Sequence, residues 1–575
     1  MPDAIGMCKM RGSAKSRKDK LAWMESVAWV RQDALTSRAI LLLIILLIAL
    51  SLSLLFYYGP SAIAGSDNFF YNEAAHLLYT KGLQSLAWAG VASIKYVVIG
   101  GAGFFQLLLG ANRLSAALFD ILLLLGLVFM TYRIGREVSG PRAGVLAAYL
   151  FAIFPLAVTQ ASGAGDDIPM TFMATLTVLL VLLARKDGKN SPLMYLISGV
   201  TAVTSFFASP EGILILIPVL MIMAYDTIRG RRVARRVQGR FRPFLSLVAG
   251  ILIAGVFFVF VGYIESGSAT YVISQEVNYY SNYCSIQSQC NTINSQSFSG
   301  YLNILLPFNL VERSIQSFRS GTVSPLASSL NPASGYIDAG YNIGFYFYFA
   351  ILFAAALAVF RKREIVLPLV LIVPILLYLS FGTMGLLGYE RIVLVYPRYT
   401  LIFFPAVCVL LGIGISELIG IHTRRGARKW ACQRIPYYAL AALFLAFMTI
   451  LSVYSVMYMD FSWYKTVYNL IGAGSYINSL PQNSDVFTLD ENRWSLVQFT
   501  DYSHTFYYYG SINTASCGSI PTDSYIVVVY NQTLQQQCDL AIAYKTENPP
   551  AWMSQYDLYD PITVDYSNLT VYRKQ

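Results

Sequence analysis

The sequence predicts a polytopic α-helical membrane protein with about eleven transmembrane helices and a small C-terminal α/β or α+β domain. Of its 575 residues, 56% are hydrophobic and only 13% are charged, and the mean hydropathy is +0.53. A soluble domain usually has about a quarter of charged residues. Apolar runs such as 39–58 and 244–263 reach the ~20 residues that a helix needs to cross a bilayer. These observations exclude a soluble enzyme, a disordered chain and a coiled coil.

The net charge of +10 indicates topology rather than nucleic-acid binding. Most of the 41 Lys and Arg residues lie before the first apolar run or in short patches between apolar runs, the largest at 229–242. Such patches mark the cytoplasmic side, because positively charged short loops resist translocation. The N terminus is then cytoplasmic and the C terminus lies outside. The expected spans are 39–57, 114–133, 143–160, 168–184, 193–208, 212–228, 243–264, 341–360, 365–383, 398–416 and 436–457.

This topology divides the chain into three parts. Residues 1–38 form a basic, amphipathic cytoplasmic segment, 39–459 the transmembrane domain, and 460–575 an extracytoplasmic domain. No cleavable signal peptide is expected, since the first apolar run is long enough to stay as an anchor. The tail alternates β-rich pieces with turn residues, and its roughly 115 residues can form their own core. The outer loops are expected at 58–113, 161–167, 265–340 and 384–397.

The apolar stretch 96–111 is predicted to lie along the membrane surface as part of the first outer loop. A crossing there would invert every later loop and place the patch at 229–242 outside. Gly100, Gly101 and Gly103 also weaken this stretch as a lone helix.

Two cysteine pairs fall in segments that are expected outside. Cys284 and Cys290 share the long outer loop, and Cys517 and Cys538 share the tail. Such compartments permit disulfides, so both pairs are candidates. The cysteine spacings and the presence of only three His argue against a structural metal site.

Three charged sites lie at the expected outer ends of spans, and each has a structural and a functional interpretation. Asp67 stands near the start of a short helix, where it could simply cap the helix. Asp166 and Asp167 precede a helix with Pro169 in its first turn, which also fits a cap. However, a pair of carboxylates at the edge of a bilayer is costly and is typical of functional sites.

Arg398 and Tyr399 open the tenth span, shortly after Glu390 and Arg391. Tyr and Arg commonly anchor helices at the interface. Alternatively, the guanidinium fork of Arg398 could bind a phosphate at the level of the lipid headgroups. The convergence of three charged sites on one membrane face is the stronger argument for function.

The sequence resembles the GT-C glycosyltransferases. Among them it is most similar to family 39 and its relatives, which include protein O-mannosyltransferases and lipid A aminoarabinose transferases. Residues 114–185 are similar to the second to fourth spans of these enzymes, and the resemblance covers most of 39–420. The family has a first-loop Asp followed by Tyr and Ala, matched here by Asp67, Tyr71 and Ala74.

The family also has a short second outer loop with an Asp before a Pro-containing helix start, matched by Asp166, Asp167 and Pro169. An RYLLPLLP-like segment of the family is matched by PRYTLIFFP at 397–405. Two features differ. The first loop has Asp67-Asn68 and a later Glu73 in place of the adjacent Asp-Glu pair of protein mannosyltransferases. The tail lacks the WWDYG motif of oligosaccharyltransferases.

The resemblance implies an inverting transfer of a sugar from a polyprenyl or dolichyl phosphate carrier to a protein, lipid or glycan acceptor outside the membrane. Asp67 would be the general base, and Arg398, with Arg391 in reserve, would support the leaving phosphate. Asp166 or Asp167 would bind sugar hydroxyls, orient the acceptor or hold a divalent cation. Tyr71, Glu73, Glu390 and Tyr399 would complete the substrate site.

No cofactor and no nucleic acid are expected, although a divalent cation is possible. The alternatives are a transporter or flippase of lipid-linked sugars and an inactive sensor on the same scaffold. A transporter would need charges within the spans, where Asp120 is nearly alone, and it would tend to have internal repeats, which the sequence lacks. A prokaryotic cell membrane is the expected location.

Overall fold

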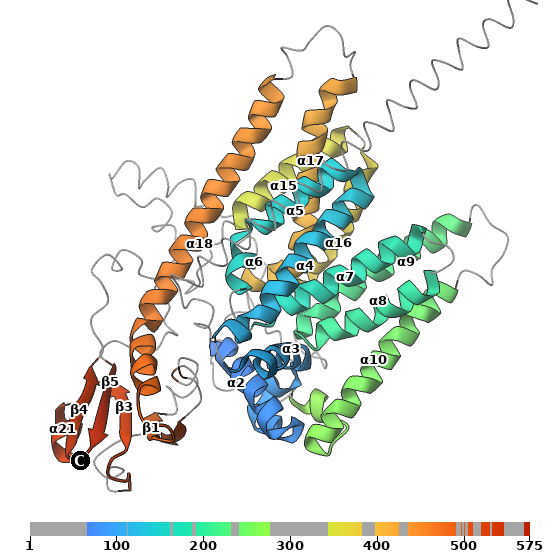
Figure 1. Cartoon of the computed structure of the whole chain (residues 1–575). Coiled ribbons are helices and arrows are strands. Elements are labelled where there is room, and N and C mark those ends of the chain that lie inside the picture. Colours follow the sequence, from blue (N-terminus) through green and yellow to red (C-terminus); the bar gives the residue numbers. More distant parts are fainter. Residues whose placement is uncertain are drawn as a thin grey trace, which may run out of the picture.

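The structure of the chain, a computed structural model, joins a helical bundle to a five-stranded sheet (Figure 1). The first expected span, 39–57, and most of the long outer loop lie outside the described residues. The described residues are 66–111, 113–161, 165–186, 191–231, 241–275, 343–360, 362–381, 397–424, 435–489, 504–509, 519–529, 532–545 and 569–575, with Leu496 and Thr500.

Helices overlap every expected span from the second onward. They are α4 (Arg113–Ser139), α5 (Pro141–Ala152), α6 (Pro155–Gln160), α7 (Asp167–Lys186), α8 (Ser191–Phe206), α9 (Leu216–Arg231), α10 (Arg242–Ser266), α15 (Ile343–Val359), α16 (Val366–Phe381), α17 (Phe404–Arg424) and α18 (Ile435–Asn478). Short 3-10 turns precede three of them: η3 (Pro210–Ile215), η5 (Arg363–Ile365) and η6 (Pro397–Phe403).

Five stretches within the described ranges are long and apolar enough to cross a membrane. They are Ala117–Ser139, Asp167–Lys186, Pro210–Thr227, Arg242–Ser266 and Arg398–Gly420. The last of these is 78% buried and the fourth only 22%, so α17 is central in the bundle while α10 exposes most of its apolar surface. The chain is therefore a helical protein with several candidate spans, and the total of eleven stays a prediction.

The core of the bundle is formed where α5 and α15 pack on α17. The ring of Phe404 at the start of α17 stacks on Phe154 with a centroid distance of 3.8 Å. The hydroxyl of Tyr346 on α15 donates to the carbonyl oxygen of Leu150 at 3.0 Å. Since Tyr346 is fully buried, this bond satisfies a polar group that could not otherwise reach water.

The expected first outer loop is helical. It forms α2 (Ser66–Lys81), η2 (Leu83–Ile94) and α3 (Tyr96–Leu109), which lie at one end of α4, α7, α8 and α10 (Figure 1). The glycines of α3 do not prevent a helix, because α3 packs on α2. A Cβ added at Gly103 would lie only 3.2 Å from the carbonyl oxygen of Ala75, so this close approach favours glycine. Its orientation relative to the membrane stays a prediction.

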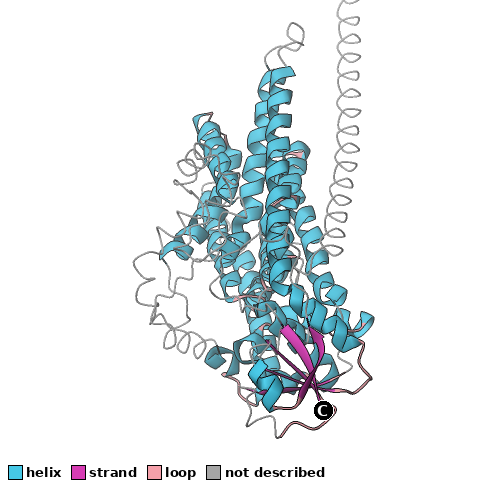
Figure 2. Ribbon diagram, turned by 90° about the vertical axis from the view of Figure 1, so that its left-hand side faces the viewer, coloured by secondary structure: helices cyan, strands magenta, loops and turns pink. Residues whose placement is uncertain are grey.

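The longest described helix, α18, extends past residue 460, where the sequence predicts the tail to begin. Its last turns bury Leu470, Ala473 and Ile477 against the sheet, which explains why the helix continues beyond the apolar span. The sheet lies at the same end of the bundle as α2 and α3 (Figure 1 and Figure 2). Its elements are β1 (Asp485–Leu489), β2 (Thr505–Tyr509), β3 (Tyr525–Val529), α21 (Gln532–Gln537), β4 (Leu540–Lys545) and β5 (Leu569–Lys574).

The strand order is β2-β1-β3-β5-β4, with β1 parallel to β2 and β3 and with β5 antiparallel to β3 and β4. Strands β3 and β5 coincide with two of the β-rich pieces of the tail. Cys538 is disulfide-bonded, while its predicted partner Cys517 lies outside the described residues, as do Cys284 and Cys290. The position of the sheet outside the membrane stays a prediction.

Two glycines let α8 and α10 cross at very short range. A Cβ added at Gly199 would lie 2.2 Å from the carbonyl oxygen of Leu247, and one at Gly250 would lie 1.9 Å from that of Leu196. Both distances are far below a real van der Waals contact, and the opposing atoms belong to the backbone. Small residues that allow such close backbone approach are a common basis of helix association in membranes.

We therefore expect Gly250→Val to separate α8 from α10 and to lower stability by about 1–3 kcal/mol, the usual cost of overpacking. Thermal unfolding of the purified protein in detergent measures this loss. Gly255→Ala is the matched control on the same helix, because a Cβ at Gly255 meets nothing within 4 Å. Equal melting temperatures for the two variants would contradict this crossing.

Candidate functional site

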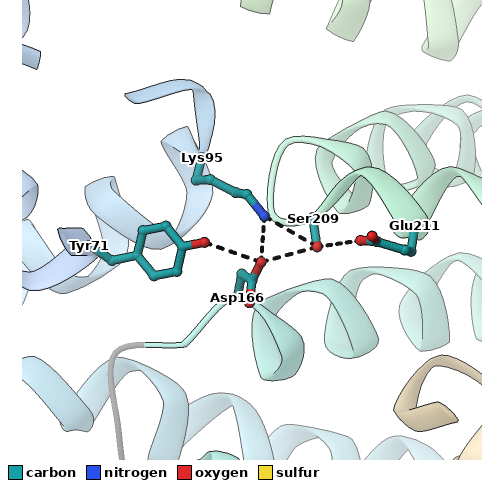
Figure 3. A network of polar contacts seen from close by, with 5 residues as sticks. All are labelled: Tyr71, Lys95, Asp166, Ser209 and Glu211. Atoms are coloured by element: carbon teal, nitrogen blue, oxygen red, sulfur yellow. Dashed lines mark hydrogen bonds and ion pairs between the residues drawn. The ribbon is translucent and has the colours of Figure 1, made fainter. Parts of the chain in front are cut away.

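Three side chains from separate segments converge on the carboxylate of Asp166, and a fourth joins them through Ser209 (Figure 3). Lys95 forms an ion pair with Asp166 Oδ2 and also donates to Ser209 Oγ at 3.3 Å. The hydroxyl of Tyr71 lies 3.4 Å from the same Oδ2, and Ser209 Oγ lies 3.1 Å from it. Ser209 Oγ is in turn 2.6 Å from Glu211 Oε2. Together these residues form the Asp166 network.

The network joins one residue within a helix to residues at three helix boundaries. Tyr71 is on α2, Lys95 directly precedes α3, Asp166 directly precedes α7, and Ser209 and Glu211 stand at the start of η3. The N–H of Met170 donates to the carbonyl of Asp166 at 3.1 Å, so Asp166 marks the beginning of α7. Its carboxylate, however, binds side chains from three other segments, which goes beyond the helix-cap interpretation.

Burial makes the electrostatics of this network strong. Lys95 and Asp166 are only 8% and 5% exposed. Burial alone would raise the pKa of Asp166, but the nearby charges of Lys95 and Arg398, with hydrogen bonds from Lys95 and Ser209, hold this pKa below its ordinary value. Asp166 is therefore ionised at neutral pH.

A buried residue of α4 supports the loop that carries Asp166. Asp120 is 1% exposed, and its Oδ2 accepts a hydrogen bond from the N–H of Gly165 at 2.8 Å. Asp120 is the acidic residue that the sequence predicts to lie within a transmembrane span. It contacts the backbone immediately before Asp166, so it fixes where α7 begins.

The structure brings together several of the predicted site residues. Asp167 is the first residue of α7 and is 2% exposed, and Arg398 in η6 interacts electrostatically with both aspartates. The guanidinium of Arg398 also lies 5.6 Å from the ring centroid of the buried Tyr399. The charged groups of the second and third predicted sites therefore meet at one end of the bundle.

The residues of the first predicted site are on α2. Tyr71 and Glu73 are 5% and 8% exposed, and Tyr71 reaches the Asp166 network. Asp67 lies in the first turn of α2, but its side chain is outside the described part of the chain, as are Glu390 and Arg391. In the described ranges no group of three or more His, Cys, Asp and Glu side chains could hold a metal ion.

Lys95, Ser209 and Glu211 were not predicted from the sequence. One signal was present: Lys95 is a single cation between the apolar stretches LAWAGVASI and YVVIGGAG, an expensive place for a charge. Ser209 and Glu211 flank Pro210 at a helix start, a pattern that resembles an ordinary cap. Only their approach to Asp166 shows that they belong to the site.

The stability of variants at the Lys95–Asp166 ion pair tests whether this pair is buried as the structure shows. Asp166→Asn leaves Lys95 buried without its countercharge, so we expect a loss of about 3–5 kcal/mol, recovered in large part by adding Lys95→Met. The control is Asp226→Asn, which breaks the exposed Arg185–Asp226 pair and should cost less than about 1 kcal/mol. Thermal unfolding in detergent compares the variants.

The lowered pKa of Asp166 also sets the pH range of this effect. Its contribution is fully present above the ordinary carboxylate pKa of about 3.9 and is lost as the pH falls toward the lower folded value. The difference between wild type and Asp166→Asn should therefore be constant from pH 5 to 8. A cost at pH 7 no larger than that of Asp226→Asn would contradict a buried ion pair.

Comparisons with known proteins agree with this architecture. Residues 102–261 match the family described as dolichyl-phosphate-mannose-protein mannosyltransferase. No curated protein matches the chain in sequence. ArnT from Cupriavidus metallidurans, solved in the apo state and bound to undecaprenyl phosphate, is similar over 92% of this chain and 97% of that one, with 11–12% identity and a TM-score of 0.53.

The oligosaccharyltransferase AglB from Archaeoglobus fulgidus, in complex with an inhibitory peptide and a dolichol-phosphate, is similar over 81% of this chain with 13% identity and a TM-score of 0.45. The chain spans 64% of the length of that protein. The family match and the fold shared with ArnT confirm the resemblance to the GT-C glycosyltransferases that the sequence motifs indicate.

Proposed function

We propose that the chain transfers a sugar from a polyprenyl phosphate carrier to an acceptor on the outer face of a prokaryotic cell membrane, with inversion at the sugar. The acceptor is a protein, a lipid or a glycan. The observation that carries the proposal is the Asp166 network together with Arg398, which places two cations and several carboxylates at one end of the helices. An anionic donor with a polar sugar needs both kinds of group.

In the proposed reaction, the acceptor oxygen or nitrogen attacks the anomeric carbon of the sugar. The bond from this carbon to the phosphate oxygen breaks, and the polyprenyl phosphate leaves with the electron pair. The proton of the acceptor passes to the carboxylate of Asp67. One displacement of this kind inverts the anomeric carbon and needs a single general base.

Arg398 and Lys95 would stabilise the negative charge that grows on the leaving phosphate. Fixed cations in a site of low dielectric are effective because they require no rearrangement when charge develops. Arg391 remains a reserve candidate. Asp166 would hold Lys95 in place, and Asp167 would bind sugar hydroxyls or the acceptor, or hold a divalent cation with Asp67. Tyr71, Glu73, Glu390 and Tyr399 would surround the donor.

The alternative, a transporter or flippase of lipid-linked sugars, moves its cargo without breaking the sugar–phosphate bond. It is less well supported, because the charged residues of the network stand at helix boundaries and not along a path through the bundle. Incubation of the purified protein with a panel of polyprenyl phosphate sugars distinguishes the two. Mass spectrometry should detect released polyprenyl phosphate and a glycosylated acceptor only for the enzyme.

Arg398 tests the phosphate part of the proposal. We expect Arg398→Ala to raise the KM for the donor at least ~10-fold, and Arg398→Lys to raise it less, since Lys keeps the charge but loses the two-pronged hydrogen bonding. Steady-state rates at varied donor concentration measure the effect. Unchanged kinetics in Arg398→Ala would remove this residue from the phosphate site.

Asp67 tests the chemical step. Asp67→Asn keeps the size and the capping ability of the side chain but cannot accept a proton at neutral pH. General-base losses are typically 10²–10⁴-fold, so turnover should fall at least ~100-fold while donor affinity is retained. If Asp67 only capped α2, Asn would serve equally well and turnover would survive. A fully active, well-folded Asp67→Asn protein would therefore refute the assigned base.

A further inference from the structure

The turn that carries Lys95 is also bound by a second buried polar cluster. The hydroxyl of Tyr96 donates to Glu265 Oε2 at 2.7 Å, and the hydroxyls of Ser93 and Tyr271 lie 2.9 Å apart beside the same carboxylate. Ser93, Glu265 and Tyr271 are 0%, 4% and 7% exposed. These four residues are called the Glu265 cluster. Glu265 lies at the end of α10 and Tyr271 just beyond it.

The side chains of this turn divide between the two polar clusters. Ser93 and Tyr96 reach the Glu265 cluster, while Lys95 reaches Asp166 and Ser209. The carbonyl of Lys95 accepts the N–H groups of Val98 and Ile99 at 3.0 and 3.1 Å, which begins α3. The backbone at Lys95 is thus fixed by residues on both sides of it in the sequence.

Aromatic packing surrounds the phenol of Tyr96. Its ring is nearly parallel to those of Phe207 and Phe258, with centroid distances of 6.0 and 6.1 Å, and the latter two rings stack at 3.9 Å. A Cβ added at Gly262 would lie 3.3 Å from the Tyr96 hydroxyl, so glycine leaves the space through which this hydroxyl reaches Glu265. The N–H of Val97 also lies 3.5 Å from the carbonyl oxygen of Phe207.

A carboxyl group in such surroundings is costly unless hydrogen bonds satisfy it, and an apolar side chain would fill the same space more cheaply. Burial raises the pKa of Tyr271 to about 12, so its hydroxyl stays protonated and available as a donor at neutral pH. Directional bonds, unlike apolar contacts, specify one orientation of the turn. The cluster therefore supplies orientation and not only packing.

We infer that Glu265 is a positioning residue, which acts through Tyr96 and Ser93 to aim the ammonium of Lys95 at the donor phosphate. This inference rests on the proposed function. It assigns a role to a carboxyl group that does not itself touch the donor. Loss of the Tyr96–Glu265 bond should let the turn adopt other conformations, so that Lys95 meets the phosphate less often.

The experiment measures binding of polyprenyl phosphate alone, without sugar or turnover, to the full chain in detergent. We expect Tyr96→Phe, which removes one hydroxyl, to weaken binding roughly 5–10-fold, the effect of one lost hydrogen bond. With a sugar donor, KM should rise by a similar factor and kcat should fall as well, because Lys95 also stabilises the charge that grows on the leaving phosphate. Glu265→Leu should behave like Tyr96→Phe, whereas Glu265→Gln, whose amide oxygen accepts the same bond, should retain most of the affinity.

Tyr149→Phe is the matched control, because it removes a half-buried tyrosine hydroxyl that contacts Thr449 Oγ1 at 2.5 Å elsewhere in the bundle. It should leave binding unchanged. Melting temperatures of all variants separate loss of affinity from loss of folding. If Tyr96→Phe does not fold, Gly262→Ala crowds the same hydroxyl from the α10 side and replaces it in the comparison.

A double-mutant cycle with Lys95→Met decides the mechanism. If the cluster acts through Lys95, Tyr96→Phe causes no further loss once Lys95 is replaced. An equal loss in both backgrounds, or unchanged binding in Tyr96→Phe alone, overturns the inference but leaves the phosphate site standing. Unchanged binding in Lys95→Met instead overturns the assignment of Lys95 in the proposed function.

Discussion

The arrangement of the helix ends near α2 and α3 depends on the buried ion pair between Lys95 and Asp166. Removing both charges from water costs several kcal/mol per ion, and their attraction offsets this cost only if further polar groups complete the geometry. Ser209, Tyr71 and Arg398 are these groups. Each belongs to a different element, so the ion pair constrains α2, η3 and η6 relative to α7. The requirement to satisfy two buried charges therefore explains why these boundaries meet at one place.

The same network limits how the site can respond to a donor. Ser209 has one hydroxyl hydrogen, yet its Oγ lies within hydrogen-bonding distance of both Asp166 and Glu211. Lys95 also donates to this oxygen, so the single hydroxyl hydrogen can serve only one of the two carboxylates at a time. A phosphate that enters here adds negative charge to a site that already balances carboxylates against two cations. Such a phosphate would compete with Asp166 for the ammonium of Lys95.

Hydropathy and charge patterning predicted the helical segments well. A span needs a continuous apolar surface whether that surface packs against other helices or faces lipid. They also predicted Asp166, Asp167 and Arg398, since charges at the ends of apolar runs are costly and stand out. Lys95 was missed because a cation next to an apolar stretch has the same local signature whether it marks topology or pairs with a distant carboxylate. The end of α18 was also missed. Polar residues near 460 predicted that the span ends there, but the helix α18 continues because the sheet buries its last turns.

Glu265 shows why the remaining part of the site could not be predicted. At the end of an apolar helix a glutamate resembles an interfacial residue, and its role follows only from Tyr96, which lies far from it in the sequence. Two helices hold the Lys95 turn: α8, through Phe207 directly after its last residue, and α10, through Glu265 and Phe258. These helices also cross at Gly199 and Gly250.

From Gly250 to Glu265 is about 22 Å along a helix at 1.5 Å per residue. A change in the separation of α8 and α10 at the glycine crossing is therefore carried to their C-terminal ends by two rigid elements. There it alters the space in which the Tyr96 ring stacks on Phe207 and Phe258 and from which its hydroxyl reaches Glu265. The position of the Lys95 ammonium group at one end of the bundle is in this way a consequence of backbone packing within the bundle. Two glycines that touch no substrate thus belong to the physical basis of the site.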